Sequence, residues 1–392
     1  MGRSERIALI QQIEQERKSK VVAYITGDRG QAGAQIGDDA LRPLYDHLRE
    51  IGHIEKLDLF IYSRGGATDV PWRIVSALRA ASDEWSVLIP FRANSAATMI
   101  ALGADHIVLG LHGELGPIDP SLTTQRIIPQ PGGGQGMVIQ DTVSVEDVMA
   151  YVRFVQQRVG LSDQGPLAES LGKLTERLDA VMLGNIYRTH SHIRDVARRI
   201  IASRREPPDA ASVDGIVSTL AEKVYAHGHA IGLKDAEQLR LPVKQAPTSL
   251  DTLMWDLLGQ YEQDMKLLEP VDPAAAVAIS DPYLEPCVIS IMESARTVHE
   301  FTGTLEVRGK RQMPPNLTVA LNIALQVPPG VNFAQLPPQA QQLLQLLQQM
   351  IGQAQQAATQ HAAQAVADAL KTQAPLLGTE VAFRNGVWKR SS

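Results

Sequence analysis

Two glycines and a serine stand where two consecutive strand-like segments end. Gly65 and Gly66 close the segment Ser63-Arg-Gly-Gly66, where the lack of side chains lets the backbone approach a ligand and turn N–H groups outward, as oxyanion stabilisation requires. Ser95 lies in Ala93-Asn-Ser-Ala-Ala-Thr98 at the expected start of a helix, where the positive end of the macrodipole favours developing negative charge. These residue types are typical of nucleophilic attack on a carbonyl group. Each also has a structural explanation, because Gly-Gly makes ordinary tight turns and serine is a good helix N-cap.

A rigid acidic segment follows along the chain. Glu114-Leu-Gly-Pro-Ile-Asp-Pro120 contains a glycine and two prolines, which fix the backbone and hold Asp119 in place 24 residues after Ser95. Aspartate before proline also commonly initiates a turn, so Asp119 has a structural explanation as well. Together the three segments offer a nucleophile, backbone amides and a carboxylate.

Strand and helix patterns alternate in the part of the chain that carries these residues. Buried strands are expected at 20–26, 57–63, 87–91 and 107–109, and helices at 3–18, 38–51, 68–82 and 95–103. This alternation predicts an α/β fold with right-handed crossovers and a mainly parallel sheet whose faces are covered. The residues with chemical potential follow the strands of that sheet.

The rest of the chain is expected to be largely helical, with a change of composition near 269–273. A Gly-rich stretch at 130–136 predicts a mobile loop beside the sheet. Further helices are predicted at 144–160, 166–206, 211–225, 233–239 and 250–267. We therefore expect a main α/β domain with helical additions at 1–268 and a C-terminal α+β region at 269–392, the latter available for oligomerisation or partner binding.

The C-terminal region ends in a long Gln/Ala-rich helix. Strands are expected at 286–292, 302–308 and 317–326, before a helix at 339–373 with almost no charge and a narrow seam of small residues. Such a helix packs on its own domain or forms an oligomerising coil, and disordered low complexity is the third interpretation.

Composition excludes several classes of protein. With 392 residues and a single cysteine, Cys287, the chain is no disulfide-stapled miniprotein. The net charge of −6 and the pI near 5.9 argue against non-specific adhesion to nucleic acid or anionic membranes. Mean hydropathy is −0.10 and no apolar run reaches spanning length, so that neither membrane insertion nor a secretory signal is predicted and the expected location is cytoplasmic.

No cofactor or metal is predicted. The Gly-rich stretch lacks the Lys-Ser/Thr of a phosphate-binding loop, and no dinucleotide fingerprint occurs. The pairs His190-Ser-His192 and His227-Gly-His229 are too closely spaced to define a zinc site without further ligands. Arginines crowd the stretch 188–205, which is typical of a solvated helix face; binding to an acidic protein surface or to nucleic acid is the alternative.

In combination the three segments resemble the Clp/crotonase superfamily over roughly residues 20–245. The likeness is greatest to the serine dehydrogenase proteinase family, relatives of signal peptide peptidase A and the Clp proteolytic subunit. Its Gly-Gly, small-Ser-small-small-Thr and Leu-Gly-Pro-Ile-Asp-Pro segments are matched here by Gly65-Gly66, Asn94-Ser-Ala-Ala-Thr98 and Leu115-Gly-Pro-Ile-Asp-Pro120, with further likeness at 144–148, 183–190 and 227–236.

The resemblance implies a spiral of β-β-α units and peptide or other acyl transfer through an acyl-enzyme. Ser95 would be the nucleophile, the N–H groups of Gly66 and Ala96 would face the oxyanion, and Gly65 would permit the close approach. It also implies a homo-oligomer acting on peptide or protein substrates. The expected function is that of an ATP-independent serine peptidase. An acyl-CoA enzyme of the crotonase type and an inactive scaffold of the same fold are the rival hypotheses.

The general base does not follow from the resemblance. Clp-type peptidases carry a histidine about where Asp119 stands, and relatives of signal peptide peptidase A use a lysine, whereas this chain has no lysine between Lys56 and Lys173. Clp-type enzymes carry their third triad member near the place of His227, so the resemblance favours His227 as base with Asp119 as its orienter. This exchange of acid and base is allowed because a triad is defined by geometry rather than by chain order. Lys173 and His190 are alternative bases, and an inactive site or a base not yet identified is the remaining possibility.

Overall fold

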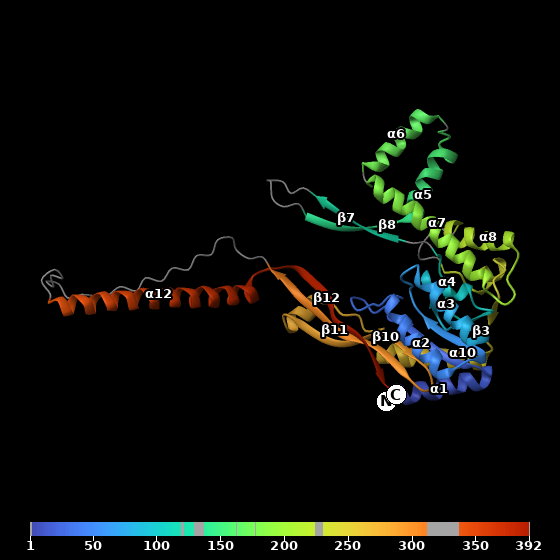
Figure 1. Ribbon diagram of the computed structural model, residues 1–392, viewed down its shortest axis with the longest axis horizontal. Helices are drawn as coiled ribbons and strands as arrows, with labels where there is room; N and C mark the ends of the chain where they lie inside the picture. The colour runs from blue at the N-terminus through green and yellow to red at the C-terminus, as the bar shows by residue number, and fades with distance from the viewer. Residues whose placement is uncertain are drawn as a thin grey trace. The chain divides into compact units, whose positions relative to one another are not determined.

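The structure, a computed structural model, describes residues 2–118, 121–128, 137–161, 163–176, 178–223, 230–311 and 337–391 (Figure 1). The chain forms two compact units: the first holds residues 1–270, 286–304 and 383–392, and the second holds 271–285 and 305–382. The chain thus leaves the first unit after Pro270, close to the predicted change of composition, and returns to it twice.

A parallel sheet forms the centre of the first unit. Its strands run in the order β1 (Lys20–Thr26), β2 (Ile54–Tyr62), β3 (Ser82–Ile89), β5 (His106–Leu109) and β9 (Val243–Gln245), each parallel to its neighbour. Helices connect the first strands: η1 (Asp38–Ala40) with α2 (Leu41–Ile51), α3 (Val70–Ala81) and α4 (Ala96–Leu102). The predicted parallel α/β core is confirmed, with most elements starting and ending within a few residues of their expected positions.

Helices cover both faces of this sheet, because successive strand residues point to opposite sides. Val22 and Tyr24 of β1 pack in one cluster with α2, α3, α4 and α7 (Ala180–Ala202), whereas Val21 and Ala23 pack in another with α1 (Gly2–Arg17) and α10 (Thr248–Asp264). Figure 1 shows α1 and α10 together against one side of the sheet. Burial on both faces explains why these strands have continuous apolar sequences.

Three C-terminal strands extend the sheet at the β1 edge. They are β10 (Tyr283–Glu293), β11 (Val298–Arg311) and β12 (Leu376–Ser391), and β10 runs antiparallel to β1 with Thr26 opposite Ser290. The whole sheet is therefore mixed rather than purely parallel. Pairing with β10 satisfies backbone groups that β1 would otherwise expose at an edge. The predicted strands 286–292 and 302–308 thus contribute to the main sheet, and β12 was not expected.

The remaining elements partly differ from the prediction. Beside the loop expected at 130–136, which lies outside the described residues, β7 (Ser121–Ile128) and β8 (Met137–Ser144) form an antiparallel hairpin, and short β4 (Arg92–Ala93) pairs with β6 (Glu114–Leu115). The strand expected at 317–326 also lies outside the described residues. Further helical elements are α5 (Val145–Arg153), η2 (Phe154–Arg158), α6 (Gln164–Thr175), α8 (Ala210–Ser218), η3 (Thr219–Lys223), α9 (Leu233–Gln238), α11 (Pro273–Ile279) and α12 (Pro338–Gln373).

A buried ion-pair network joins α1, α10 and β10. The Arg6 Nε lies 2.6 Å from Glu293 Oε2, and Tyr261 donates its hydroxyl to the same oxygen at 2.9 Å. Arg6 also pairs with Asp264. Arg6 and Glu293 are 2% and 0% exposed, so that each buried charge needs the other as its counter-charge. Burial raises the pKa of Glu293 even though Arg6 opposes the change.

Replacing Arg6 by methionine is expected to destabilise the fold by about 3–5 kcal/mol, because the Glu293 carboxylate then stays buried without its partner. The double variant Arg6→Met/Glu293→Gln should recover at least half of that loss, since glutamine removes the charge and still accepts the Tyr261 hydroxyl. Urea unfolding followed by circular dichroism measures both. Equal losses in the single and the double variant would contradict this account.

Two imidazoles meet between α2 and the C-terminal strands of the first unit. His47 is 0% exposed, and its Nε2 lies 3.1 Å from His299 Nδ1 and 3.1 Å from the Met292 carbonyl oxygen. Burial, and then the charge of His299, lowers the pKa of His47 to about 4. The native state therefore prefers the neutral ring. Asp46, Glu50 and Arg390 are the charged groups nearest to the pair.

We expect the free energy of unfolding to fall as the pH drops from 6.5 towards 4. Unfolded histidine takes up a proton near pH 6.5 while native His47 does not, so that protonation favours unfolding by roughly 3 kcal/mol at the lower limit. Urea titrations at several pH values should show this slope, and His47→Gln should flatten it. The control is His53→Gln, because His53 is exposed and pairs with Asp83. An unchanged slope in His47→Gln would rule out this origin.

Candidate active site

Ser95 occupies a sharp turn between β4 and α4. Its backbone has φ 51° and ψ −114°, a left-handed conformation that non-glycine residues rarely adopt. The residue is half-buried, whereas Ala93 before it and Ala96 after it are buried. Strain of this kind costs on the order of 1–3 kcal/mol and persists only where the surrounding structure imposes it. The turn keeps Ser95 at the surface end of an otherwise buried helix.

The glycine pair packs directly against this turn. A Cβ atom built on Gly65 would lie 2.7 Å from Ser95 Cβ, 2.8 Å from the Asn94 carbonyl oxygen and 3.1 Å from the Ala96 nitrogen. Gly65 itself has φ 108°. Only glycine therefore fits here, and the prediction that Gly65 permits a close backbone approach agrees with these contacts.

Main-chain hydrogen bonds join the glycine segment to the serine segment. The Ser63 amide donates to the Arg92 carbonyl at 3.1 Å, and the Asn94 amide donates to the Ser63 carbonyl at 3.0 Å. The Ser63 hydroxyl accepts the Gly65 amide at 3.0 Å and the Thr26 hydroxyl at 2.7 Å. The Ser63 hydroxyl thus connects the Gly65-Gly66 loop to Thr26.

Gly66 lies against Ile36 on the other side. The Ile36 amide donates to the Gly65 carbonyl at 2.8 Å, and the Ala67 amide donates to the Ile36 carbonyl at 2.9 Å. A Cβ on Gly66 would lie 2.3 Å from that Ile36 oxygen. Among the described residues no acceptor takes the amide of Gly66 or of Ala96. These two amides belong to the glycine segment and the serine segment, which meet where Gly65 packs against Ser95.

Thr98 connects the serine segment to the third segment. Its hydroxyl lies 2.7 Å from the Ala93 carbonyl oxygen and 2.9 Å from the Gly116 carbonyl oxygen, and it accepts the Gly116 amide at 3.1 Å. Because the side chain is fully buried, its role is to hold the two segments together. The motif contains this threonine, but sequence reasoning assigned it no function.

The third segment, Glu114–Pro120, approaches the Ser95 turn through its first residues. Leu115 pairs with Ile231, with amide-to-carbonyl distances of 3.0 and 2.8 Å. Asp119 and His227, the predicted orienter and base, lie outside the described residues. Among the described side chains none hydrogen-bonds to the Ser95 hydroxyl.

The alternative bases have other partners. The Lys173 side chain is 70% exposed on α6 and lies 3.9 Å from Glu169. A lysine that serves as general base is normally buried so that it can lose its charge, and Lys173 is not buried in this way. His190 on α7 lies 3.5 Å from a Glu146 oxygen that Arg194 also approaches, at 2.8 Å.

The expectation of a solvated arginine face is wrong for two of the arginines in 188–205. Arg194 is 6% exposed because it binds Glu146, and Arg204 is 7% exposed because its Nε donates to the Leu102 carbonyl at 2.7 Å. Arg204 thereby meets the carboxyl end of α4. Neither side chain is available to a polyanion.

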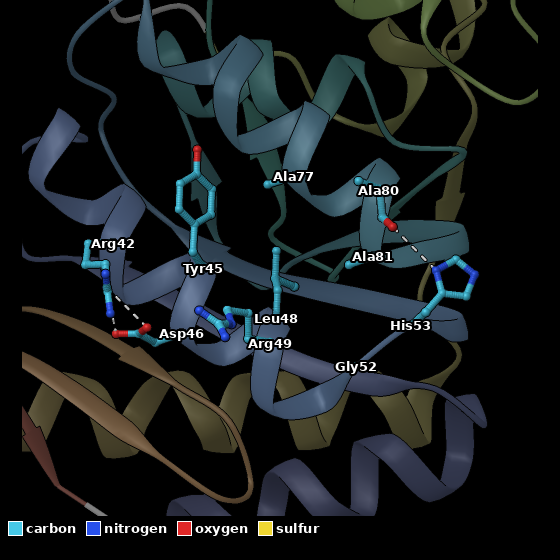
Figure 2. A pocket seen from close by; sticks show the side chains of 10 residues that line it. All are labelled: Arg42, Tyr45, Asp46, Leu48, Arg49, Gly52, His53, Ala77, Ala80 and Ala81. Atoms are coloured by element: carbon cyan, nitrogen blue, oxygen red, sulfur yellow. Dashed lines mark hydrogen bonds and ion pairs between the residues drawn. The ribbon is translucent and has the colours of Figure 1, made fainter.

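A groove of about 510 Å³ lies between α2 and α3, apart from these segments (Figure 2). Leu48, Ala77 and Ala81 line it, while Arg42 pairs with Asp46 at its rim. None of the predicted site residues lines this groove.

In the described ranges no helix has the length and apolarity to cross a membrane, and no three His, Cys, Asp or Glu residues are grouped to hold a metal ion.

Comparison with known sequences agrees with the motifs. Residues 2–131 match the family described as ClpP-like SDH-type serine proteinase. Two uncharacterized proteins of Methanocaldococcus jannaschii are similar: MJ0137 is 41% identical over 66 residues, 17% of this chain and 23% of that protein, and MJ1495 is 30% identical over 130 residues, 30% of this chain and 42% of that protein. The chain thus matches less than half of either relative. The match supports the predicted family for the segment that carries Gly65, Gly66 and Ser95, since residues 2–131 are similar to the ClpP-like SDH-type serine proteinases.

Proposed function

We propose that the protein is a serine peptidase that hydrolyses peptide bonds, without ATP, through an acyl-enzyme on Ser95. The observation that supports this most is the packing of Gly65 against the strained Ser95 turn, with the Gly66 and Ala96 amides left without acceptors among the described residues. A turn kept strained at the surface and unused donors beside it are features that a structural N-cap does not require.

The proposed reaction begins with attack of the Ser95 oxygen on the substrate carbonyl carbon, while its proton passes to a general base. The carbonyl π bond becomes the negative charge of a tetrahedral adduct, which the amides of Gly66 and Ala96 stabilise. The adduct then collapses, the C–N bond breaks, and the base returns the proton to the leaving amine. Water repeats the sequence on the ester and regenerates the hydroxyl.

His227 oriented by Asp119 remains the proposed base. The pairing of Leu115 with Ile231 supports it, because these two residues flank the segments that carry the acid and the base. Lys173 is a weaker candidate since its side chain is exposed, and His190, which lies beside Glu146, is the other alternative. Activity of His227→Ala, Lys173→Ala and His190→Ala ranks the three.

The function is tested with a fluorophosphonate probe and unfolded casein. We expect the probe to label the native protein on the peptide that contains Ser95, identified by mass spectrometry, and casein to be cleaved without nucleotide. Labelling elsewhere, or none in folded protein, would instead favour the inactive scaffold. Activity on a CoA thioester without labelling would favour the crotonase-type rival.

We also propose a homo-oligomer, as is common among ClpP-like proteins. The helix α12 exposes Leu343, Leu346 and Met350 to 56–60%, which gives a long apolar surface for contact with a second copy. Light scattering should give a mass that is a multiple of the 42.7 kDa chain. A mass of one chain at micromolar concentration would contradict the proposal.

A further inference from the structure

One carboxylate at the carboxyl end of β1 gathers three side-chain donors. The Tyr62 hydroxyl donates to Asp28 Oδ1 at 2.8 Å. Arg64 Nε and Arg92 Nη1 both donate to Oδ2, at 2.7 and 3.2 Å. The Asp28 side chain is only 14% exposed and that of Arg92 17%, so that this pair is largely removed from water, whereas the Arg64 side chain is 59% exposed.

The three donors come from the two segments that form the candidate site. Tyr62 ends β2 and Arg64 directly precedes Gly65, whereas Arg92 begins β4 three residues before Ser95. The main-chain bonds between these segments are made at Ser63 and end before the glycine pair. The Asp28 carboxylate adds a side-chain connection at Arg64, next to the glycines.

Neighbouring groups keep the Tyr62 hydroxyl protonated and the Arg92 guanidinium close to Asp28. Burial and the Asp28 charge both raise the pKa of Tyr62, so its hydroxyl stays protonated and continues to donate. The Arg92 guanidinium lies 3.9 Å from the centre of the Phe91 ring and 3.9 Å from Glu114, which limits its freedom to leave Asp28. On α10, Glu262 is close enough for the Asp28 charge to raise its pKa, after the larger effect of burial.

We propose that Asp28 is a positioning residue of the active site, which holds the Gly65-Gly66 loop against the Ser95 turn. This inference rests on the proposed function, because it concerns the distance between the Gly66 amide and the Ser95 hydroxyl. Catalytic groups that are displaced by about 1 Å lose on the order of 100-fold in rate. Asp28 touches no substrate in this account and acts through Arg64 and Arg92.

The test compares Asp28→Asn with Asp58→Asn. Asp58 is a matched control, because its carboxylate also accepts two arginine bonds, both at 2.9 Å from Arg17, and a hydroxyl bond, at 2.6 Å from Ser19. It lies on β2 beside the start of β1, away from the Ser95 turn. Removing either charge weakens a similar cluster, but only one cluster holds the glycine loop.

In Asp28→Asn we expect kcat to fall about 10- to 100-fold with KM changed less than about 3-fold. The rate of fluorophosphonate labelling at Ser95 should fall by a similar factor. Asp58→Asn should change kcat less than about 3-fold. Tyr62→Phe, which removes one neutral donor, should have a smaller effect than Asp28→Asn. Equal losses of kcat in the two aspartate variants would overturn the proposal.

Hydrogen–deuterium exchange separates this inference from the proposed function. We expect a peptide spanning 63–67 to exchange at least about 10-fold faster in Asp28→Asn than in the parent, and at the parent rate in Asp58→Asn. If the parent neither hydrolyses casein nor is labelled, the proposed function fails, while faster exchange still supports the positioning role. Unchanged exchange in Asp28→Asn rules that role out, whatever the parent does.

Discussion

Replacement of Ser95 by alanine is expected to lower the rate of peptide hydrolysis by about 10⁴-fold or more and to abolish fluorophosphonate labelling. In the proposed mechanism Ser95 forms the acyl-enzyme, so that only binding and oxyanion stabilisation remain in the variant, as in other serine enzymes without their nucleophile. Casein hydrolysis and the mass of the labelled protein measure the two effects. Near-parental hydrolysis by this variant would show that the chemistry does not pass through Ser95.

The control for that variant is Ser95→Gly, which separates strain from chemistry. Glycine adopts φ 51° without the Cβ penalty but costs more backbone entropy on folding. We expect Ser95→Gly to be inactive and yet as stable as the parent or up to about 1 kcal/mol more stable in urea unfolding. A clear loss of stability would mean that the serine side chain itself supports the turn.

Replacement of Gly65 by alanine is the second change with a large expected effect. Its Cβ would lie 2.7 Å from Ser95 Cβ and 2.8 Å from a backbone oxygen that has no freedom to move, and the backbone at φ 108° disfavours any side chain. We expect kcat to fall about 100- to 1000-fold, the loss typical of a misplaced oxyanion donor. Fluorophosphonate labelling should slow by a similar factor.

Gly52→Ala is the matched control for backbone strain alone. Gly52 has φ 77°, also unfavourable for alanine, but its added Cβ would meet no atom within 4 Å. This variant should lose about 1 kcal/mol of stability and keep its activity. If Gly65→Ala behaved like Gly52→Ala, the contact between the glycine loop and Ser95 would have no catalytic importance.

Local sequence pattern was sufficient to predict the parallel core and the segments that carry Gly65 and Ser95. The strand at 20–26 was predicted with its exact bounds, and α12 within one residue of its start, because a buried strand and a long helix each leave a continuous signal in the sequence. Gly65 and Ser95 stood out because a missing side chain after a strand and a serine before a run of small residues are visible locally.

Contacts between distant segments were not visible in the same way. The antiparallel pairing of β10 with β1 joins residues more than 260 positions apart, and apolar content alone does not select the partner strand. The sequence analysis assigned Asp28 no role, since nothing near it in the sequence indicates that Arg64 and Arg92 are its partners. Arg194 and Arg204 were expected in solvent because an arginine-rich helix does not reveal which of its residues faces a carboxylate or a helix end.

The residue types and their order along the chain were therefore enough to point to the family that residues 2–131 match and to propose Ser95 as nucleophile, since backbone freedom and exposed hydroxyls are properties of short segments. Only the folded chain decided that Gly65 has no room for a side chain beside Ser95, and that Asp28 links the two loops. Such facts are distances between segments, and these distances are set when folding brings the ends of β1 and β2 next to β4, which contacts the β2 end through the Ser63–Ala93 bridge.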